Sequence, residues 1–152
     1  ILEDILTESL ENYLKTIYTI ILKKNGVRVK DIAKQLKVKN SSVTVALRTL
    51  ATKGYINYEP YGIISLTEKG HEVSKKITEK HRILTYFFSN ILSLDKNSSE
   101  DIASKMEHVL TEDAFKRFKC YIEFFLQWKE ANPNWINEFD AFCKQKQIQG
   151  LD

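Results

Sequence analysis

Residues 28–70 read RVKDIAKQLKVKNSSVTVALRTLATKGYINYEPYGIISLTEKG, and their order of helix and turn signals decides the fold. Apolar residues at helical spacing predict a short helix over residues 29–36, followed by a tight turn. Ser41 and Ser42 are good N-cap residues for the next helix, which we expect to run to about Lys53. The inner stripe of this helix is apolar and its other faces are small and polar, so it has the pattern of a DNA recognition helix.

A β-hairpin is predicted directly after this helix. Gly54 ends the helix, and residues 55–58 and 63–66 read as two strands on either side of a Pro- and Gly-containing turn at residues 59–62. Thr67 is then well placed to cap a further helix. Helix, turn, helix and hairpin in this order predict a winged helix-turn-helix.

The rest of the chain is predicted to be helical, because it contains few of the five Gly and two Pro residues of the sequence. We expect an amphipathic helix before the winged motif and a run of helices after it, over residues 8–23, 67–93, 99–110, 111–127 and 135–146. Ser99 and Thr111 are the expected caps of two of them. The predicted fold is mostly α, with an N-terminal winged helix-turn-helix domain at residues 1–72 and an all-helical domain at residues 73–152.

Composition excludes several classes of protein. Hydrophobic residues make up 43% of the chain and charged residues 28%, which are ordinary values for a soluble globular protein. No apolar run approaches the roughly 18 to 20 residues of a membrane span. Cys120 and Cys143 are far apart, as expected of reduced thiols in a cytoplasmic protein. Without a Gly-rich phosphate loop, GxSxG or HExxH, the sequence does not predict an enzyme.

Charge favours a nucleic-acid partner for the first half of the chain. Residues 1–82 carry 15 Lys and Arg against 9 Asp and Glu, whereas residues 83–152 carry 8 against 11. A basic half suits double-stranded DNA, although a protein-binding winged helix has a similar pattern. The residues expected to contact DNA lie at the start of the preceding short helix, on the recognition helix or just before it, and on the wing: Arg28, Lys39, Asn40, Ser41, Ser42, Thr44, Val45, Arg48 and Tyr61.

Several motifs resemble one known family. LTESLENYLKTIYTI, the stretch quoted above, EKHRIL and MEHVLTED are similar to motifs of the metal-dependent regulators that include the manganese transport regulator and the diphtheria toxin repressor. The resemblance spans residues 6–125. It implies a homodimer that binds palindromic DNA through the winged helix. It also implies that the all-helical second domain is a metal-sensing and dimerisation domain, in which a divalent metal, Mn or Fe, switches DNA binding on.

The resemblance implies a metal-ligand set that comes from both domains: Asn12, His81, Ser104, Glu107 and His108. His81, Glu107 and His108 match the family's motifs. Asn12 and Ser104 stand where relatives have stronger donors, and Lys15 stands where the manganese branch has a second carboxylate.

Three arrangements are therefore open. In the first, one metal binds Glu107 with His81 or His108. In the second, Lys15 pairs with Glu107 and replaces the metal. In the third, the metal uses another set, such as Glu8, Glu11, Glu100 or Asp101 with the histidines. The expected function is a metal-responsive DNA-binding regulator that represses metal-uptake genes. The alternative is a winged-helix regulator whose metal switch is lost or replaced by Lys15 and Glu107, and which binds DNA constitutively or senses another signal.

Overall fold

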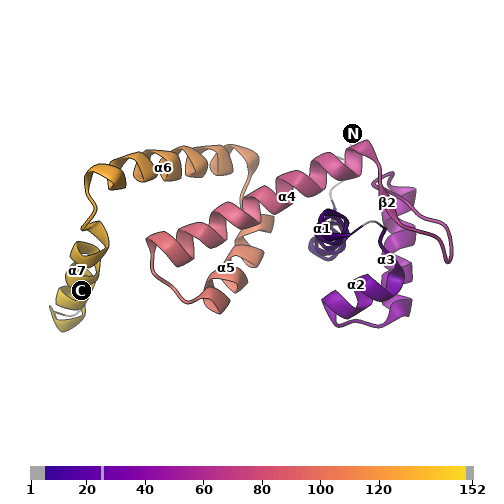
Figure 1. The fold of residues 1–152 in the computed structure, drawn as a ribbon, viewed down its shortest axis with the longest axis horizontal. Helices are drawn as coiled ribbons and strands as arrows, with labels where there is room; N and C mark the ends of the chain where they lie inside the picture. Colours follow the sequence, from indigo (N-terminus) through magenta and orange to yellow (C-terminus); the bar gives the residue numbers. More distant parts are fainter. Residues whose placement is uncertain (1–5, 25, 150–152) are drawn as a thin grey trace. The chain divides into compact units, whose positions relative to one another are not determined.

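The computed structural model describes residues 6–24 and 26–149 and divides into two compact units, Ile1–His81 and Arg82–Asp152 (Figure 1). The elements follow the predicted order: α1 (Glu8–Lys23), α2 (Val29–Leu36), α3 (Asn40–Thr52), β1 (Ile56–Asn57), β2 (Ser65–Leu66), α4 (Glu68–Tyr86), the π-helical turn η1 (Phe87–Ile91), α5 (Lys96–Val109), α6 (Glu112–Ala131) and α7 (Trp135–Gln149). The mostly α fold with an N-terminal winged helix-turn-helix is confirmed. Parts of both predicted domains, residues 1–5 and 150–152, lie outside the described residues.

One apolar core holds the N-terminal unit together. Its fully buried side chains include Leu14 and Ile17 of α1, Ile32 of α2, and Leu47 and Leu50 of α3. Each such side chain stabilises the fold by roughly 1.5 to 3 kcal/mol. Because α1, α2 and α3 share this core, the outer face of α3 is held in a fixed orientation.

The hairpin is shorter than predicted. Its ladder pairs Ile56 with Leu66 and Asn57 with Ser65 in antiparallel register. Ile64 is not part of this ladder. Its N–H donates instead to the carbonyl oxygen of Val27 at 2.9 Å. The wing is thereby tied to the segment that precedes α2.

The start of α4 is hydrogen-bonded to the segment that follows α3. The Thr67 hydroxyl caps α4 as predicted, accepting from Gly70 N at 3.0 Å, and it donates to the Gly54 carbonyl oxygen at 2.7 Å. Gly70 lies so close to the Tyr55 carbonyl that a Cβ atom at Gly70 would stand 1.8 Å from that oxygen. Only glycine fits here, so this close approach fixes how α4 leaves the wing.

The predicted cap of α3 is wrong. Ser41 and Ser42 lie inside the first turn, because the helix begins at Asn40 and Lys39 is its N-cap residue. The Lys39 carbonyl oxygen accepts from Ser42 N at 3.1 Å and from Val43 N at 3.3 Å. No side chain caps this helix, and both serines are left exposed.

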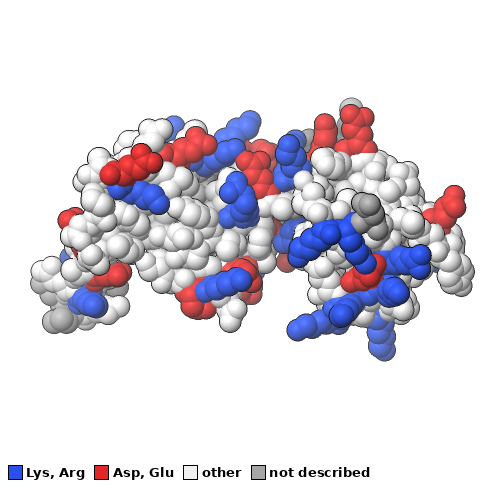
Figure 2. Space-filling model, viewed as in Figure 1, with Lys and Arg blue, Asp and Glu red and all other residues white. Residues whose placement is uncertain are grey.

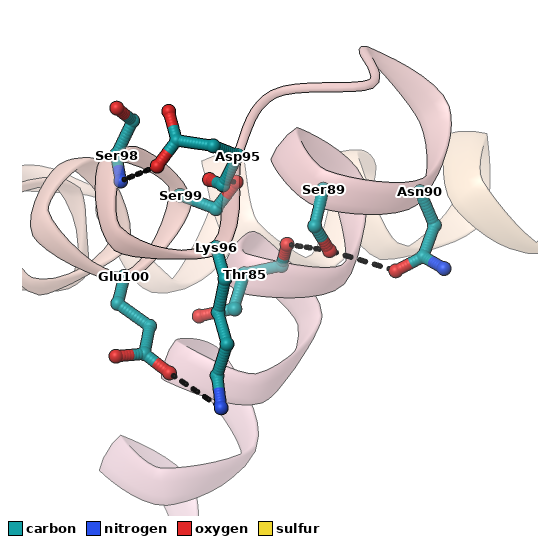
Figure 3. A network of polar contacts seen from close by, with 8 residues as sticks. All are labelled: Thr85, Ser89, Asn90, Asp95, Lys96, Ser98, Ser99 and Glu100. Atoms are coloured by element: carbon teal, nitrogen blue, oxygen red, sulfur yellow. Dashed lines mark hydrogen bonds and ion pairs between the residues drawn. The ribbon is translucent and has the colours of Figure 1, made fainter.

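The predicted start of α5 is also wrong. Asp95 caps the helix, accepting from Ser98 N at 3.0 Å, so α5 begins at Lys96 (Figure 3). Ser99, the predicted cap, is fully buried and donates its hydroxyl to the Asp95 carbonyl oxygen at 2.8 Å. The cap of α6 is as predicted: Thr111 accepts from Ala114 N at 3.3 Å.

The second unit has a small core. One cluster of buried apolar residues in it contains Ile83, Ile91, Phe115 and Ile122. Phe87 stacks edge-on against Phe118 with the ring centroids 5.0 Å apart. Across the described residues, no helix is both long and apolar enough to cross a membrane. Asn25 is not among the residues described.

Candidate nucleic-acid interface and metal-ligand residues

The recognition helix α3 presents a polar outer face. Its inner stripe is buried, whereas Asn40 and Arg48 are exposed and Val45 retains 64% of its accessible surface. Thr44 is half-buried and donates its hydroxyl to the Asn40 carbonyl oxygen at 3.0 Å. The outer face also carries the exposed hydroxyls of Ser41 and Ser42. Its larger donors are the Asn40 amide and the Arg48 guanidinium, which are the groups that read adenine and guanine edges.

A groove of about 570 Å³ runs between α3, the start of α2 and the wing. It brings together five of the residues predicted to contact DNA: Arg28, Asn40, Thr44, Arg48 and Tyr61. Other residues complete its lining: Val29, Lys30, Tyr58, Pro60 and Gly62. The other predicted contacts do not line the groove but are exposed at the start and along the outside of α3: Lys39, Ser41, Ser42 and Val45.

The wing ends in an exposed aromatic residue. Tyr61 is fully accessible, at 103%, and its φ is +64°, in the left-handed region that residues with a side chain seldom adopt. The turn is closed by Gly62 N, which donates to the Glu59 carbonyl oxygen at 2.9 Å. An aromatic ring held out in a strained conformation is an indication of a contact surface.

Basic side chains gather over α2 of the N-terminal unit (Figure 2). Asp31 organises the start of this helix, because its carboxylate accepts from Arg28 N at 2.9 Å and lies 2.8 Å from Lys24 Nζ. The hydrogen bond from Lys24 lowers the pKa of Asp31; burial opposes this effect, and the Arg28 N–H reinforces it. The carboxylate therefore remains charged and fixes the backbone from which Arg28 enters the groove.

Sequence reasoning identified the readers on α3 and the basic character of Lys30, but left Tyr58 and Pro60 out of the predicted contacts. Lys30 lies two residues after Arg28 at the start of α2, and its basic character was the signal available for it. Tyr58 and Pro60 line the groove only because the wing folds against the α2 start, which the local pattern did not reveal.

The predicted metal ligands belong to different units. Asn12 and His81 are half-buried in the N-terminal unit, and Asn12 lines a hollow of about 500 Å³ with Glu8, Ser9, Tyr13, Leu36 and Val38. Ser104, Glu107 and His108 lie on α5 in the second unit. Within neither unit do three His, Cys, Asp or Glu side chains of residues 6–24 and 26–149 gather into a metal-binding group.

Glu107 and His108 are the predicted ligands that the structure brings together. His108 Nε2 lies 3.6 Å from Glu107 Oε1, and only 9% and 1% of the two side chains are exposed. Carboxylate oxygen and imidazole nitrogen are both ligands for Mn²⁺ and Fe²⁺. The chemistry of the pair fits one divalent ion, and further donors are needed to complete its coordination.

The second unit leaves an apolar hollow on α6 uncovered. It measures about 620 Å³ and is lined by Leu110, Ala114, Arg117, Phe118, Cys120, Tyr121 and Phe124. Tyr121 and Phe124 retain 53% and 66% of their surface. A face of this kind on a small core is typical of a protein–protein interface.

The two units match two family models. Residues 5–64 match the N-terminal DNA binding domain of iron dependent repressors, and residues 67–136 match their metal binding and dimerisation domain. An uncharacterised HTH-type transcriptional regulator of Methanocaldococcus jannaschii is 40% identical over 121 residues, which cover 79% of this chain and 97% of that protein. The HTH-type transcriptional regulator MntR of Lysinibacillus sphaericus is 32% identical over 142 residues, covering 93% and 99%.

Solved structures show the same fold. A manganese-dependent transcriptional repressor in complex with manganese is 26% identical with a TM-score of 0.68, over 76% of this chain and 53% of that one. The IdeR protein of T. acidophilum is 28% identical with a TM-score of 0.65, over 80% and 55%. The chain thus spans about half the length of these solved chains and nearly the full length of its curated relatives. Together with the winged helix-turn-helix, these matches show that the chain belongs to the iron-dependent repressor family of transcriptional regulators, which are not enzymes.

Proposed function

We propose that the chain is a metal-responsive repressor of metal-uptake genes that binds a palindromic operator as a homodimer in the cytoplasm. The observation that carries the proposal is the groove between α3, the start of α2 and the wing. In it, polar and basic readers of DNA come from three separate segments: Asn40, Thr44 and Arg48; Arg28 and Lys30; and Tyr61.

The groove suits a duplex in which α3 enters the major groove. Arg48 then meets guanine O6 and N7 with two parallel hydrogen bonds, and Asn40 can pair with adenine N6 and N7 in the same manner. Arg28 and Lys30, at the start of α2, supply positive charge for the phosphates that border the groove. The wing brings the exposed Tyr61 ring to the neighbouring backbone or minor groove.

The metal response is assigned to the second unit. Glu107 and His108 would hold the ion, with Ser104 of the same helix as a further ligand that the family resemblance implies. The ion would supply a fixed double positive charge. Glu107 contributes a carboxylate oxygen that burial otherwise makes costly, and His108 contributes an imidazole nitrogen.

Dimerisation is assigned to the apolar hollow on α6. Tyr121 and Phe124 offer aromatic surface that a second copy of the chain would cover. Two winged helices carried by one dimer would read two half-sites of a palindrome.

The test is selection of bound duplexes from a random DNA pool by metal-stripped protein, with chelator or with Mn²⁺ or Fe²⁺. We expect a palindrome to be enriched only with metal. Arg48→Ala should lose about 1 to 3 kcal/mol of preference at its base pair. His108→Ala should enrich no palindrome with or without metal, while keeping its non-specific binding to duplex DNA. Equal enrichment with chelator would contradict the metal switch, and no enrichment would contradict DNA recognition.

A further inference from the structure

The groove between α3, the start of α2 and the wing is called the readout groove below. A second, smaller cleft lies beside it in the N-terminal unit. It measures about 240 Å³ and is lined by Lys24, Gly26, Arg28, Lys30, Asp31 and Ile63. Arg28 and Lys30 also line the readout groove, so the two hollows are joined along one basic edge. We call this second hollow the basic cleft.

The walls of the basic cleft are fixed by the backbone. Gly26 has a φ of +84°, and a Cβ atom there would stand 3.3 Å from Ile63 Cγ2, so glycine lets this segment approach the wing. The next residue, Val27, accepts the hydrogen bond from Ile64 N at 2.9 Å. The end of α1, the start of α2 and the wing are therefore joined at the basic cleft.

The charges in the basic cleft favour a single anion. Lys24, Arg28 and Lys30 bring three positive charges against the one negative charge of Asp31. Asp31 Oδ1 holds Lys24 Nζ at 2.8 Å, yet 49% of the Lys24 side chain remains exposed. An ammonium has three N–H donors, so Lys24 can keep Asp31 as a partner and still donate to a ligand oxygen.

We propose that the basic cleft binds a phosphodiester of the DNA backbone outside the readout groove, with Lys24 donating to it from the end of α1. The inference rests on the proposed DNA-binding function and extends it to a residue on an element outside the helix-turn-helix. The size of the cleft fits a phosphate and its shared edge places the phosphate next to the bases being read. A contact of this kind adds affinity without base preference, and the affinity falls as salt rises.

Lys23 provides a matched control. It is the last residue of α1, adjacent to Lys24, exposed, and absent from the lining of the basic cleft. Lys23→Gln and Lys24→Gln each remove one positive charge at nearly the same place in the sequence. A difference between them therefore reports the contact and not the overall charge.

The experiment measures fluorescence anisotropy on the selected operator and on a random duplex, from about 50 to 200 mM salt. For Lys24→Gln we expect the slope of log K against log salt to fall in magnitude by about 0.9 per protomer. Operator and random duplex should weaken by the same factor. Lys23→Gln should leave the slope unchanged, and Lys24→Arg should restore it. Equilibrium unfolding of each variant establishes that the fold is intact.

Three outcomes are distinct. If wild type binds no duplex, the proposed function itself fails. If wild type binds but Lys24→Gln and Lys23→Gln share its slope, the basic cleft holds no phosphate and Lys24 is only a structural partner of Asp31. If Lys24→Gln weakens the operator but spares random DNA, Lys24 acts in base recognition, and the proposal is again overturned.

Discussion

Replacing Tyr61 with glycine should make the protein more stable and its DNA binding weaker. Tyr61 occupies the third position of the turn at residues 59–62 with a φ of +64°. The left-handed conformation costs a residue with a side chain roughly 1 to 2 kcal/mol. Since Tyr61 is fully exposed, the substitution uncovers no core surface. The greater freedom of glycine in the unfolded chain offsets about 0.4 to 1 kcal/mol of this gain. The net increase in unfolding free energy is therefore about 0 to 1.6 kcal/mol, with a midpoint of about 0.8 kcal/mol.

Urea unfolding and operator binding test the two halves of this prediction. Ser93→Gly is the matched control, because Ser93 is exposed, has a φ of +59° and belongs to the second unit. Both variants should gain stability. Only Tyr61→Gly should lose operator affinity, by about fivefold or more, which is about 1 kcal/mol.

Two results would refute the reasoning about Tyr61. A loss of stability in Tyr61→Gly would mean that the ring makes contacts that offset its backbone strain. Unchanged operator affinity would mean that the strained ring does not touch DNA, and the wing tip would then have to be removed from the interface.

Three further predictions concern packing, assembly and pH. Gly70→Ala should lower the free energy of unfolding in urea by about 3 kcal/mol or more, because its Cβ would collide with the Tyr55 carbonyl. Gly54→Ala, whose Cβ would have no atom within 4 Å, should lower it by less. Equal losses would refute the close approach of Gly70 to Tyr55. Phe124→Asp should yield a folded monomer in sedimentation equilibrium, and a persistent dimer would place the interface elsewhere. Asp31→Asn should destabilise the protein above about pH 4, since a lowered folded-state pKa adds stability that is lost as pH falls through it; a loss that persists at lower pH would point to another cause.

The fold could be predicted because its signals are local. Apolar spacing and the caps Thr67 and Thr111 located the helices, and both caps make the expected hydrogen bonds. The start of α5 was missed because several adjacent residues can cap a helix. Asp95 takes the role, while Ser99 is drawn into the core, and burial of that kind depends on tertiary packing that no local pattern encodes.

The candidate site could be predicted only in part. The outward face of α3 follows from helical periodicity, so Asn40 and Arg48 were found from the sequence. The basic cleft depends on the bridge between Val27 and Ile64, which are far apart in the chain, and Lys24 therefore gave no signal. Glu107 and His108 are neighbours in sequence, so their proximity was expected, and the ligand roles of Asn12, His81, Ser104, Glu107 and His108 all stay predictions.

The threonines of α3 have a consequence for the water that DNA binding displaces. Thr44, Thr49 and Thr52 donate their hydroxyls to carbonyl oxygens one turn earlier in their own helix, at 3.0, 3.2 and 2.9 Å. These hydroxyl groups already donate within the helix, so they need no new acceptor when DNA binding removes the surrounding water. Thr44 can then turn its methyl group toward the bases. The recognition face should therefore shed hydration water at little cost and favour thymine methyl groups at the step facing Thr44. Arg48, Asn40 and the exposed hydroxyls of Ser41 and Ser42 are then left as the groups whose hydrogen bonds with water must be replaced by hydrogen bonds to the operator.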